Sequence, residues 1–300
     1  MKAVRFSRFG GPEVLEIVDL PDPHPGPGQL RIEVRAAGVN ASDWKKRQGL
    51  LDPDLPQTLG YEAAGVVDAV GEGVAGVAVG DRVFGFAPDG AAQAELAVLS
   101  AWARIPASLD FVEAAALPSS VETAARALDQ LGVADGCRLL INGASGNVGS
   151  AAVQLAVARG AEVIGTAGVS NLDYLRGLGA EPVAYGDGLV DRVRMLAPNG
   201  VDLALDVAGS GVLPDLIELT GGRPEQVLTV ADYAGAQRYG VRFSRGDTGR
   251  ALYVLGEIGE LIESGRFVLP TVQTFPLADI ELVHRAGEEG VRGKLVLVVD

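Results

Sequence analysis

The sequence has few of the side chains that form disulfides and metal sites. Among its 300 residues it has one cysteine, Cys137, and two histidines, His24 and His284. A single thiol excludes an intramolecular disulfide and any zinc site built from several cysteines. We expect Cys137 to be a small buried side chain. His24 lies in a proline-rich loop and His284 on an expected helix, which argues against a histidine-dependent triad.

Long apolar runs and positive charge are also scarce. No apolar run reaches the length that spans a bilayer, and the first residues are typical of a short strand and not of a signal peptide, so we expect a cytoplasmic protein. Lys and Arg number 25 against 39 Asp and Glu, giving a net charge of −14. This balance argues against nucleic acid or an anionic membrane as the main partner. Aromatic residues make up only 5% of the chain, so Val, Leu, Ala and Ile must form most of the core.

Glycine is abundant, and one glycine-rich stretch is the most informative feature of the chain. It reads Leu139-Leu140-Ile141-Asn142-Gly143-Ala144-Ser145-Gly146-Asn147-Val148-Gly149, and an apolar helical pattern follows it to Ala158. Gly143 permits a tight turn, Gly146 lets a pyrophosphate approach the backbone, and Gly149 lets the helix pack closely on the strand. The helix N-terminus attracts phosphates. The strand before the glycines and the helix after them favour a dinucleotide site over an ordinary glycine-rich turn.

The rest of the chain indicates a mixed α/β architecture with two domains. Residues 1–110 are mostly β and rich in turns, residues 111–264 alternate helix and strand, and residues 265–300 return to β and are expected to rejoin the first part. A helical stretch over 111–131 should break near Pro118. Strands are expected at 138–141, 163–166, 182–185, 201–207 and 227–230, with Gly160 and Gly179 ending helices. This succession predicts a doubly wound parallel sheet, with the ligand in a cleft between the two domains.

The end of the second expected strand bears on the choice of nucleotide. NAD-preferring folds place an acid there, about 20 residues after the first glycine. Here Glu162 lies at the beginning of the strand, and Ser170 and Asn171 follow Thr166 in its place. The missing carboxylate removes a repulsion against a 2′-phosphate and so favours NADPH. Ser170 and Asn171 are equally compatible with a helix N-cap.

These residues carry a resemblance to a known family. The segments 142–156 and 163–167 resemble the coenzyme domain of zinc-independent quinone oxidoreductases, a branch of the medium-chain dehydrogenase/reductase superfamily. The resemblance extends to four further segments: Gly38-Val39-Asn40-Ala41-Ser42-Asp43-Trp44-Lys45, Leu59-Gly60-Tyr61-Glu62-Ala63-Ala64-Gly65-Val66-Val67, Gly80-Asp81-Arg82-Val83-Phe84-Gly85 and Gly293-Lys294-Leu295-Val296-Leu297. Two positions depart from the family pattern, which commonly has Ser where this chain has Gly168 and Gly where it has Asn147.

The resemblance implies a GroES-like catalytic domain, a Rossmann coenzyme domain, NADPH as cofactor and a homodimer joined through the edges of the coenzyme sheets. It implies that Thr123 contacts the nicotinamide or its ribose and that Tyr185 contacts the ribose-phosphate end. The cofactor contacts that we expect are Asn40, Thr123, Gly143, Ser145, Gly146, Asn147, Val148, Gly149, Thr166, Ser170, Asn171, Tyr185, Ala208, Thr229, Val230 and Lys294. Ordinary structural roles remain open: a helix residue for Thr123, core packing for Tyr185 and a surface turn for Lys294.

Compared with the zinc alcohol dehydrogenases of the same superfamily, this chain has Asn40 where they have Cys and Tyr61 where they have His. Their third ligand falls near Ser119 and Ser120. Asn amides and Tyr phenols are poor zinc ligands, so we expect no metal.

Without a Lewis acid, the favoured acceptors of hydride are compounds that already delocalise charge, such as quinones and α,β-unsaturated carbonyls. Tyr61 is the candidate proton donor, Asn40 a candidate for holding the nicotinamide or the acceptor oxygen, and Lys45 a candidate acid or electrostatic stabiliser. Structural roles stay open for all three: packing beside its motif for Tyr61, a loop amide that bonds the backbone for Asn40, and a solvated loop lysine for Lys45. Asp43 is expected to fix its loop by hydrogen bonds. Two alternatives stay open: a dedicated enoyl or enone reductase of a biosynthetic pathway, and an NADPH-binding structural or sensor protein without turnover.

Overall fold

The computed structural model describes residues 1–88, 90–246 and 249–299. The chain divides into two compact units, each described by itself below. Unit 1 comprises Met1–Ser119, Leu255–Gly259 and Leu269–Asp300, and unit 2 comprises Ser120–Val254 and Glu260–Val268. The first division therefore falls later in the chain than the expected start of the coenzyme domain at residue 111. The segment in between includes helix α2 (Phe111–Ala115), whose alanines are buried and which packs against β3 and β5 of unit 1.

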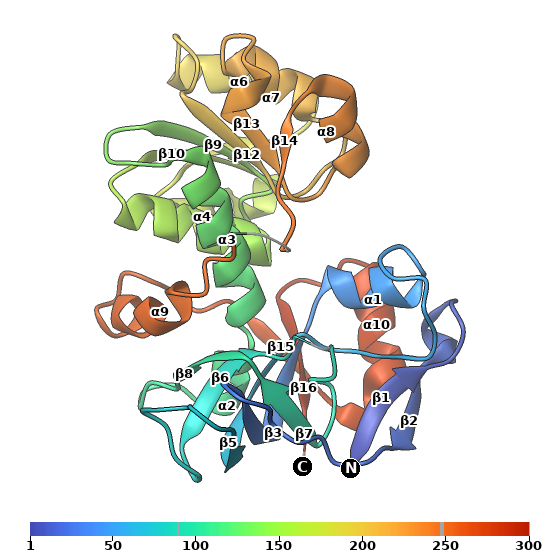
Figure 1. Ribbon diagram of the computed structural model, residues 1–300. Coiled ribbons are helices and arrows are strands. Elements are labelled where there is room, and N and C mark those ends of the chain that lie inside the picture. The colour runs from blue at the N-terminus through green and yellow to red at the C-terminus, as the bar shows by residue number, and fades with distance from the viewer. Residues whose placement is uncertain (89, 247–248, 300) are drawn as a thin grey trace. The chain divides into compact units, whose positions relative to one another are not determined.

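Unit 1 is built from two sheets (Figure 1). The smaller has the order β2-β1-β4, and the larger has the order β15-β16-β3-β5-β6-β8, with β7 pairing with β3. Its strands are β1 (Lys2–Phe6), β2 (Glu16–Asp19), β3 (Leu30–Val39), β4 (Gln57–Thr58), β5 (Glu62–Val70), β6 (Arg82–Phe86), β7 (Leu96–Leu99), β8 (Ala101–Arg104), β15 (Val272–Pro276) and β16 (Lys294–Val298). Its other helices are α1 (Ala41–Arg47) and α10 (Ile280–Glu288). The C-terminal strand β16 lies antiparallel beside β3, with Leu295 opposite Val39, so distant parts of the sequence form one sheet.

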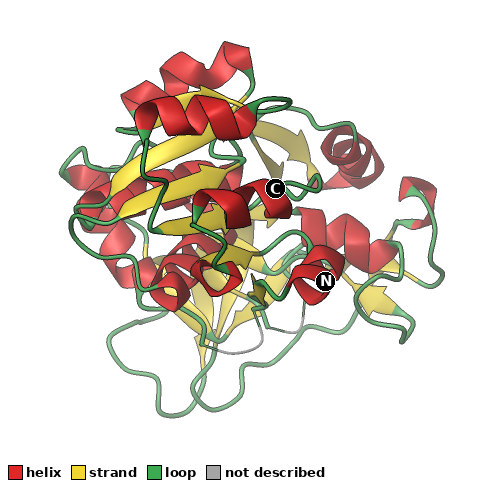
Figure 2. Cartoon of the chain, turned by 90° about the horizontal axis from the view of Figure 1, so that it is seen from above, coloured by secondary structure: helices red, strands yellow, loops and turns green. Residues whose placement is uncertain are grey.

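Unit 2 is a doubly wound parallel sheet with the order β11-β10-β9-β12-β13-β14, which confirms the expected fold class. Its strands are β9 (Arg138–Asn142), β10 (Glu162–Ala167), β11 (Glu181–Ala184), β12 (Leu203–Asp206), β13 (Val227–Thr229) and β14 (Arg242–Phe243). The helices are α3 (Pro118–Leu131), α4 (Asn147–Ala158), α5 (Leu172–Gly177), α6 (Leu189–Leu196), α7 (Leu213–Leu219), α8 (Tyr233–Tyr239) and α9 (Val254–Glu263); the residues of α3 and α9 are divided between the two units. Short 3₁₀ helices cover Val169–Asn171 and Pro224–Gln226 in unit 2, and Pro12–Val14 and Leu277–Asp279 in unit 1. Figure 2 shows the strands running between helices.

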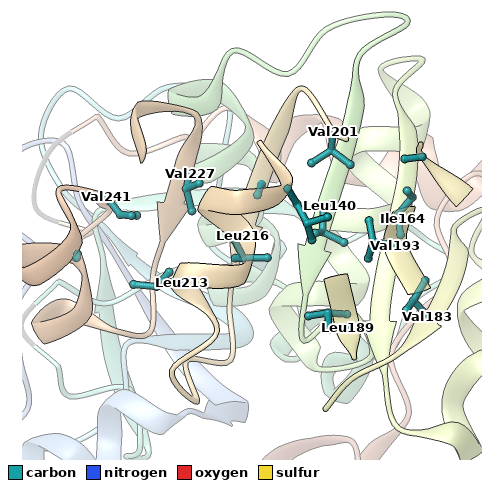
Figure 3. Close-up of a cluster of buried hydrophobic side chains, with 14 residues drawn as sticks. Leu140, Ile164, Val183, Leu189, Val193, Val201, Leu213, Leu216, Val227 and Val241 are labelled. Atoms are coloured by element: carbon teal, nitrogen blue, oxygen red, sulfur yellow. The ribbon is translucent and has the colours of Figure 1, made fainter. Parts of the chain in front are cut away.

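The core of unit 2 consists of branched aliphatic side chains and alanines, as the low aromatic content predicts. One face of the sheet carries a continuous cluster that includes Leu140 and Ile164 of the strands, Val193 of α6, and Leu213 and Leu216 of α7 (Figure 3). On the opposite face, α4 packs against β9 and β10. Because this helix begins directly after β9, the packing fixes its N-terminus beside the end of that strand.

Two features differ from the sequence expectations. Cys137 is only half-buried, because it lies in the turn before β9 and not within the strand. Strand β14 was not anticipated, since it is only two residues long and gives no periodic signal. Among the described residues, no helix is long and apolar enough to cross a membrane.

His284 is a buried residue of α10 whose ring packs beside that of Trp44 on α1. It is fully buried on α10, its ring meets that of Trp44 of α1 edge-on at 6.3 Å, and neither ring nitrogen has a hydrogen-bond partner among the described residues. Burial, assisted by the positive charge of Arg47, lowers the pKa of His284 from 6.5 to about 3. The imidazole is therefore neutral in the folded protein at neutral pH.

We expect His284 to make the protein less stable in mild acid. Between pH 6.5 and 3 the unfolded chain binds a proton at this residue that the folded chain does not, so stability falls as pH falls. The contribution is about 2 kcal/mol between pH 7 and pH 5. Urea unfolding of wild-type protein and of His284→Phe at both pH values measures it.

The change in stability with pH must be compared between wild-type protein and His284→Phe. Asp43, whose pKa is raised, shifts stability in the opposite direction in both proteins. His284→Phe should remove the loss, and the exposed His24→Gln should not. Equal pH dependence in wild-type protein and His284→Phe would contradict this assignment.

Candidate active site

Asp43 ties together the two loops that carry the candidate catalytic residues. Its Oδ2 accepts the N–H of Asn40 at 2.8 Å, and its Oδ1 accepts the N–H of Gly60 at 3.1 Å. Complete burial raises the pKa of Asp43 from 3.8 to about 6, although the two N–H donors oppose this shift. The structure confirms that Asp43 fixes its loop, and it shows that the same carboxyl also holds the loop before Tyr61.

Asn40 belongs to a buried polar cluster with Glu62 and Lys294. The Asn40 amide nitrogen donates to Glu62 Oε1 at 2.7 Å, and the Lys294 amine donates to the Asn40 amide oxygen and, at 2.5 Å, to Glu62 Oε1. Glu62 Oε2 accepts the N–H of Ser119 at 2.6 Å. Lys294 and Glu62 are fully buried. The structure places the amine of Lys294, an expected cofactor contact, in this internal cluster with Asn40.

Tyr61 lies beside a lysine that the sequence reasoning missed. Lys46 Nζ is 5.4 Å from the centre of the Tyr61 ring and donates to the Thr58 carbonyl at 3.0 Å. Lys46 is only 7% exposed, whereas the candidate Lys45 is exposed on the same helix. Burial lowers the pKa of Lys46. Helical position within α1 decides which of these adjacent lysines turns inward, and this helix is too short to give that signal in the sequence.

Burial also shifts the titration of the Tyr61 phenol. Tyr61 is half-buried, and burial raises its pKa above 10.0, with further upward contributions from the charges of Asp43 and Asp52. The phenol therefore keeps its proton at neutral pH, which is the form that donates a hydrogen bond.

The three glycines after β9 have distinct roles in unit 2. Gly143 has φ +81°, and a Cβ there would lie 2.7 Å from the Ala208 Cβ. A Cβ at Gly149 would overlap the Gly143 carbonyl oxygen, so this residue lets α4 approach the turn. Gly146 is the N-cap of α4, is exposed, and a Cβ there would meet only the Gly143 carbonyl at 3.5 Å. The fold therefore requires Gly143 and Gly149 but not Gly146, which leaves open backbone at the helix N-terminus.

A buried polar network joins the ends of four neighbouring strands beside these glycines. Thr166 Oγ1 donates to Asn142 Oδ1 at 2.8 Å and accepts the Gly143 N–H at 3.1 Å. Asn142 Nδ2 donates to Asp206 Oδ1 at 2.9 Å, and Thr229 Oγ1 donates to Asp206 Oδ2 at 2.7 Å. The network fixes the carboxyl edge of the sheet, where ligands of such folds bind.

Two of the expected cofactor residues, Thr166 and Thr229, use their hydroxyls within this network and are fully buried. Ala208 and Val230 lie just beyond it and are exposed and half-buried, respectively. Asp206 was missed by the sequence reasoning. The sequence does offer a signal for Asp206, because it is a single acidic residue directly after the apolar run Leu203-Ala204-Leu205.

The residues after β10 form a second part of the candidate cofactor site. Ser170 is exposed, Asn171 Nδ2 lies 3.4 Å from Ser145 Oγ, and neither side chain caps α5. Tyr185 is 63% exposed. Its hydroxyl would lie 3.5 Å from a Cβ at Gly168, so an exposed aromatic ring borders this glycine. Asn147 and Val148, in the first turn of α4, are half-buried.

Thr123 lies elsewhere in unit 2, on α3, near a buried ion pair. Its hydroxyl is 3.4 Å from Arg126 Nη2, and Arg126 Nε donates to Glu122 Oε1 at 3.0 Å. Arg126 also bonds to Ser244, and Glu122 accepts the N–H of Ala251 at 3.1 Å. The ion pair thus holds Ser244 and Ala251 to the helix that carries Thr123.

The geometry was compared with known proteins. Residues 26–102 match the alcohol dehydrogenase GroES-like domain, and residues 147–228 match the zinc-binding dehydrogenase domain. The structure of the quinone oxidoreductase from Coxiella burnetii superimposes with a TM-score of 0.84 at 32% identity, over 100% of this chain and 99% of that one. The chain belongs to the quinone oxidoreductase-like branch of the medium-chain dehydrogenase/reductase superfamily. This confirms the resemblance read from the sequence.

Curated relatives of this chain carry several different descriptions. The quinone oxidoreductase of Rattus norvegicus is 42% identical over 174 residues, which are 56% of this chain and 53% of that protein. The spectinabilin polyketide synthase system protein NorB of Streptomyces orinoci is 35% identical over 98% of this chain, which matches 14% of that protein. The chain spans about half the length of the first curated relatives it matches.

Proposed function

We propose that the protein is an NADPH-dependent, zinc-independent reductase of quinones or α,β-unsaturated carbonyls. The observation that carries this proposal is the cluster of Asn40, Glu62 and Lys294. Asn40 stands at the position where the zinc enzymes of the superfamily have a cysteine ligand. The Lys294 amine donates to the Asn40 amide oxygen, and the amine and the Asn40 amide nitrogen both donate to the Glu62 carboxylate. The chain's similarity to quinone oxidoreductases supports the same acceptor class.

The donor set supports a reaction without zinc. Zinc in this superfamily needs thiolate or imidazole ligands, whereas the positions concerned hold the Asn40 amide and the Tyr61 phenol. Both polar ends of the Asn40 amide are already engaged. The positive charge of Lys294 lies 2.5 Å from Glu62 and would repel a divalent cation there. Among the described residues, no group of three or more His, Cys, Asp or Glu side chains is placed to hold a metal ion.

The turn after β9 fits a dinucleotide. Gly146 leaves its backbone free of side-chain cover, and the first N–H groups of α4 have no intrahelical partners. We propose that these groups bind the pyrophosphate and that Ser170, Asn171 and Tyr185 bind the 2′-phosphate end. The first acid after β10 is Asp173, which is 97% exposed and paired with Arg176. No carboxylate therefore repels a phosphate at the end of this strand, which supports NADPH over NADH.

When bound, the nicotinamide supplies a hydride. The chain must orient the acceptor and supply a proton. Addition of a hydride to a quinone leaves a monoanion that takes up one proton to become the hydroquinone. A phenol is protonated at neutral pH and burial raises the pKa of Tyr61 further, so this side chain can hydrogen-bond to the developing oxyanion, and we propose that it supplies the proton. The Lys46 amine lies 5.4 Å from the centre of the Tyr61 ring. We propose Lys46 in the electrostatic role first assigned to Lys45.

Replacing Tyr61 with phenylalanine tests the proton donor. We expect kcat to fall by about 100-fold, since general acids contribute that order of magnitude, while the Kd for NADPH stays unchanged. Steady-state kinetics and NADPH titration measure the two quantities. Tyr239→Phe, a change at a partly exposed residue of α8, is the matched control. Unchanged turnover in Tyr61→Phe would remove this residue from the reaction.

A second candidate function is that of a dedicated enoyl or enone reductase in a biosynthetic pathway. The similarity to NorB over 98% of this chain favours it. A panel of quinones, small enones and thioester-linked enoyl groups separates the two functions by their kcat/KM values. A preference for the thioester-linked substrates would support the pathway enzyme. NADPH binding without consumption on any acceptor would instead support a protein that only binds the nucleotide.

We also propose a homodimer formed through the edge of the coenzyme sheet. Strand β14 lies at that edge, and pairing with a second copy would satisfy the backbone groups of an edge strand.

A further inference from the structure

Three adjacent strands bring Asn40, Glu62 and Lys294 to one end of the larger sheet of unit 1. Asn40 follows β3, Glu62 begins β5 and Lys294 begins β16. Strand β3 pairs with β16 on one side and with β5 on the other. Residues from three distant parts of the sequence are therefore placed side by side by backbone pairing, before any side-chain contact forms.

The Glu62 carboxylate is held in one position. Its Oε1 accepts from Asn40 and Lys294, and its Oε2 accepts the N–H of Ser119. Gly38 leaves the necessary space, since a Cβ there would overlap the carboxylate. Both carboxylate oxygens accept hydrogen bonds, and the side chain is fully buried. The carboxylate therefore restrains the positions of the groups that donate to it.

The orientation of the Asn40 amide depends on both of its charged neighbours. Its nitrogen donates to Glu62, and its oxygen accepts from Lys294. A flipped amide would point its oxygen at the carboxylate and its N–H groups at the amine, so both contacts would become repulsive. In the observed orientation, the amide nitrogen also lies 3.4 Å from Ser119 Oγ.

We propose that Lys294 is a positioning residue that acts through Asn40 and does not contact the cofactor itself. Its amine fixes the amide orientation that Asn40 presents to the reacting groups, and it balances the buried charge of Glu62. The kinetic part of this inference rests on the proposed function. The structural part, that Lys294 holds Asn40, does not.

A double-mutant cycle on Lys294→Met, Asn40→Ala and the combined variant tests the proposal. We expect Lys294→Met to lower kcat by about tenfold or more while the Kd for NADPH and the KM for the acceptor change by less than about twofold. The combined variant should be no slower than Asn40→Ala. Lys294→Arg should recover part of kcat. Lys2→Met, at an exposed lysine of the same unit, is the control.

Thermal unfolding of the same variants tests the contact between Lys294 and Asn40 without depending on turnover. If Lys294 holds Asn40, the Tm losses of the two single changes will not add in the combined variant. Additive losses would overturn the proposal even if the protein reduces no acceptor tested. Direct contact between Lys294 and the cofactor would also overturn the proposal. It would be indicated if Lys294→Met raised the Kd for NADPH about tenfold over wild type and the combined variant raised it by the same factor over Asn40→Ala.

Discussion

Replacing Asp206 with alanine is expected to lower the free energy of unfolding by about 3–5 kcal/mol. Its Oδ1 accepts from Asn142 and from the N–H groups of Ala208 and Gly209, and its Oδ2 accepts from Thr229. The carboxyl is fully buried. Each donor left unpaired in the interior costs about 1–3 kcal/mol, less where water enters the space left behind. Urea unfolding followed by circular dichroism measures the change.

The matched control is Asp173→Ala, because this aspartate is 97% exposed and should change stability by less than about 0.5 kcal/mol. A loss below about 1 kcal/mol in Asp206→Ala would show that the network does not hold the strand ends together. The Asp206 change should also weaken NADPH binding, since the same carboxyl orders the turn after β12.

Replacing Gly146 with valine is expected to weaken NADPH binding by about 100-fold or more while leaving the fold intact. The residue is exposed, its φ of −78° suits any L-amino acid, and only the Gly143 carbonyl would lie near a new Cβ, at 3.5 Å. A branched side chain there would cover the backbone that we propose binds the pyrophosphate. Isothermal titration gives the Kd, and thermal unfolding gives the Tm.

The contrasting variant is Gly149→Ala. Its Cβ would overlap the Gly143 carbonyl oxygen, so we expect the Tm to fall even without cofactor. Gly146→Val should leave the Tm within about 2 °C of wild type. If Gly146→Val bound NADPH with wild-type affinity, the pyrophosphate would not lie on this turn, and the assignment of the cofactor site would be wrong.

The sequence predicted the parallel sheet of unit 2 because its signals are local. Apolar runs bounded by glycine turns marked β9, β10 and β13, and Pro118 marked the break between α2 and α3. Strand β14 has two residues and is created by pairing with β13. No local pattern distinguishes such a segment from a loop.

The candidate site was less predictable because its contacts join distant segments. Glu62 and Lys294 meet across 232 positions of sequence, and only the antiparallel pairing of β16 with β3 brings them together. The motif containing Lys294 was recognised, but its position in the chain does not reveal that the amine is buried. Lys46 was missed for a related reason, since packing around α1 determines which lysine faces Tyr61.

Metal content and turnover, measured on one preparation, test the central claim most directly. Protein treated with a chelator should contain well below about 0.1 zinc per chain and should consume NADPH with a quinone at the rate of untreated protein. NADH should support a slower rate at the same concentration. If the protein bound about one zinc per chain and lost turnover in proportion to zinc removal, the account of hydride transfer without a metal would be contradicted.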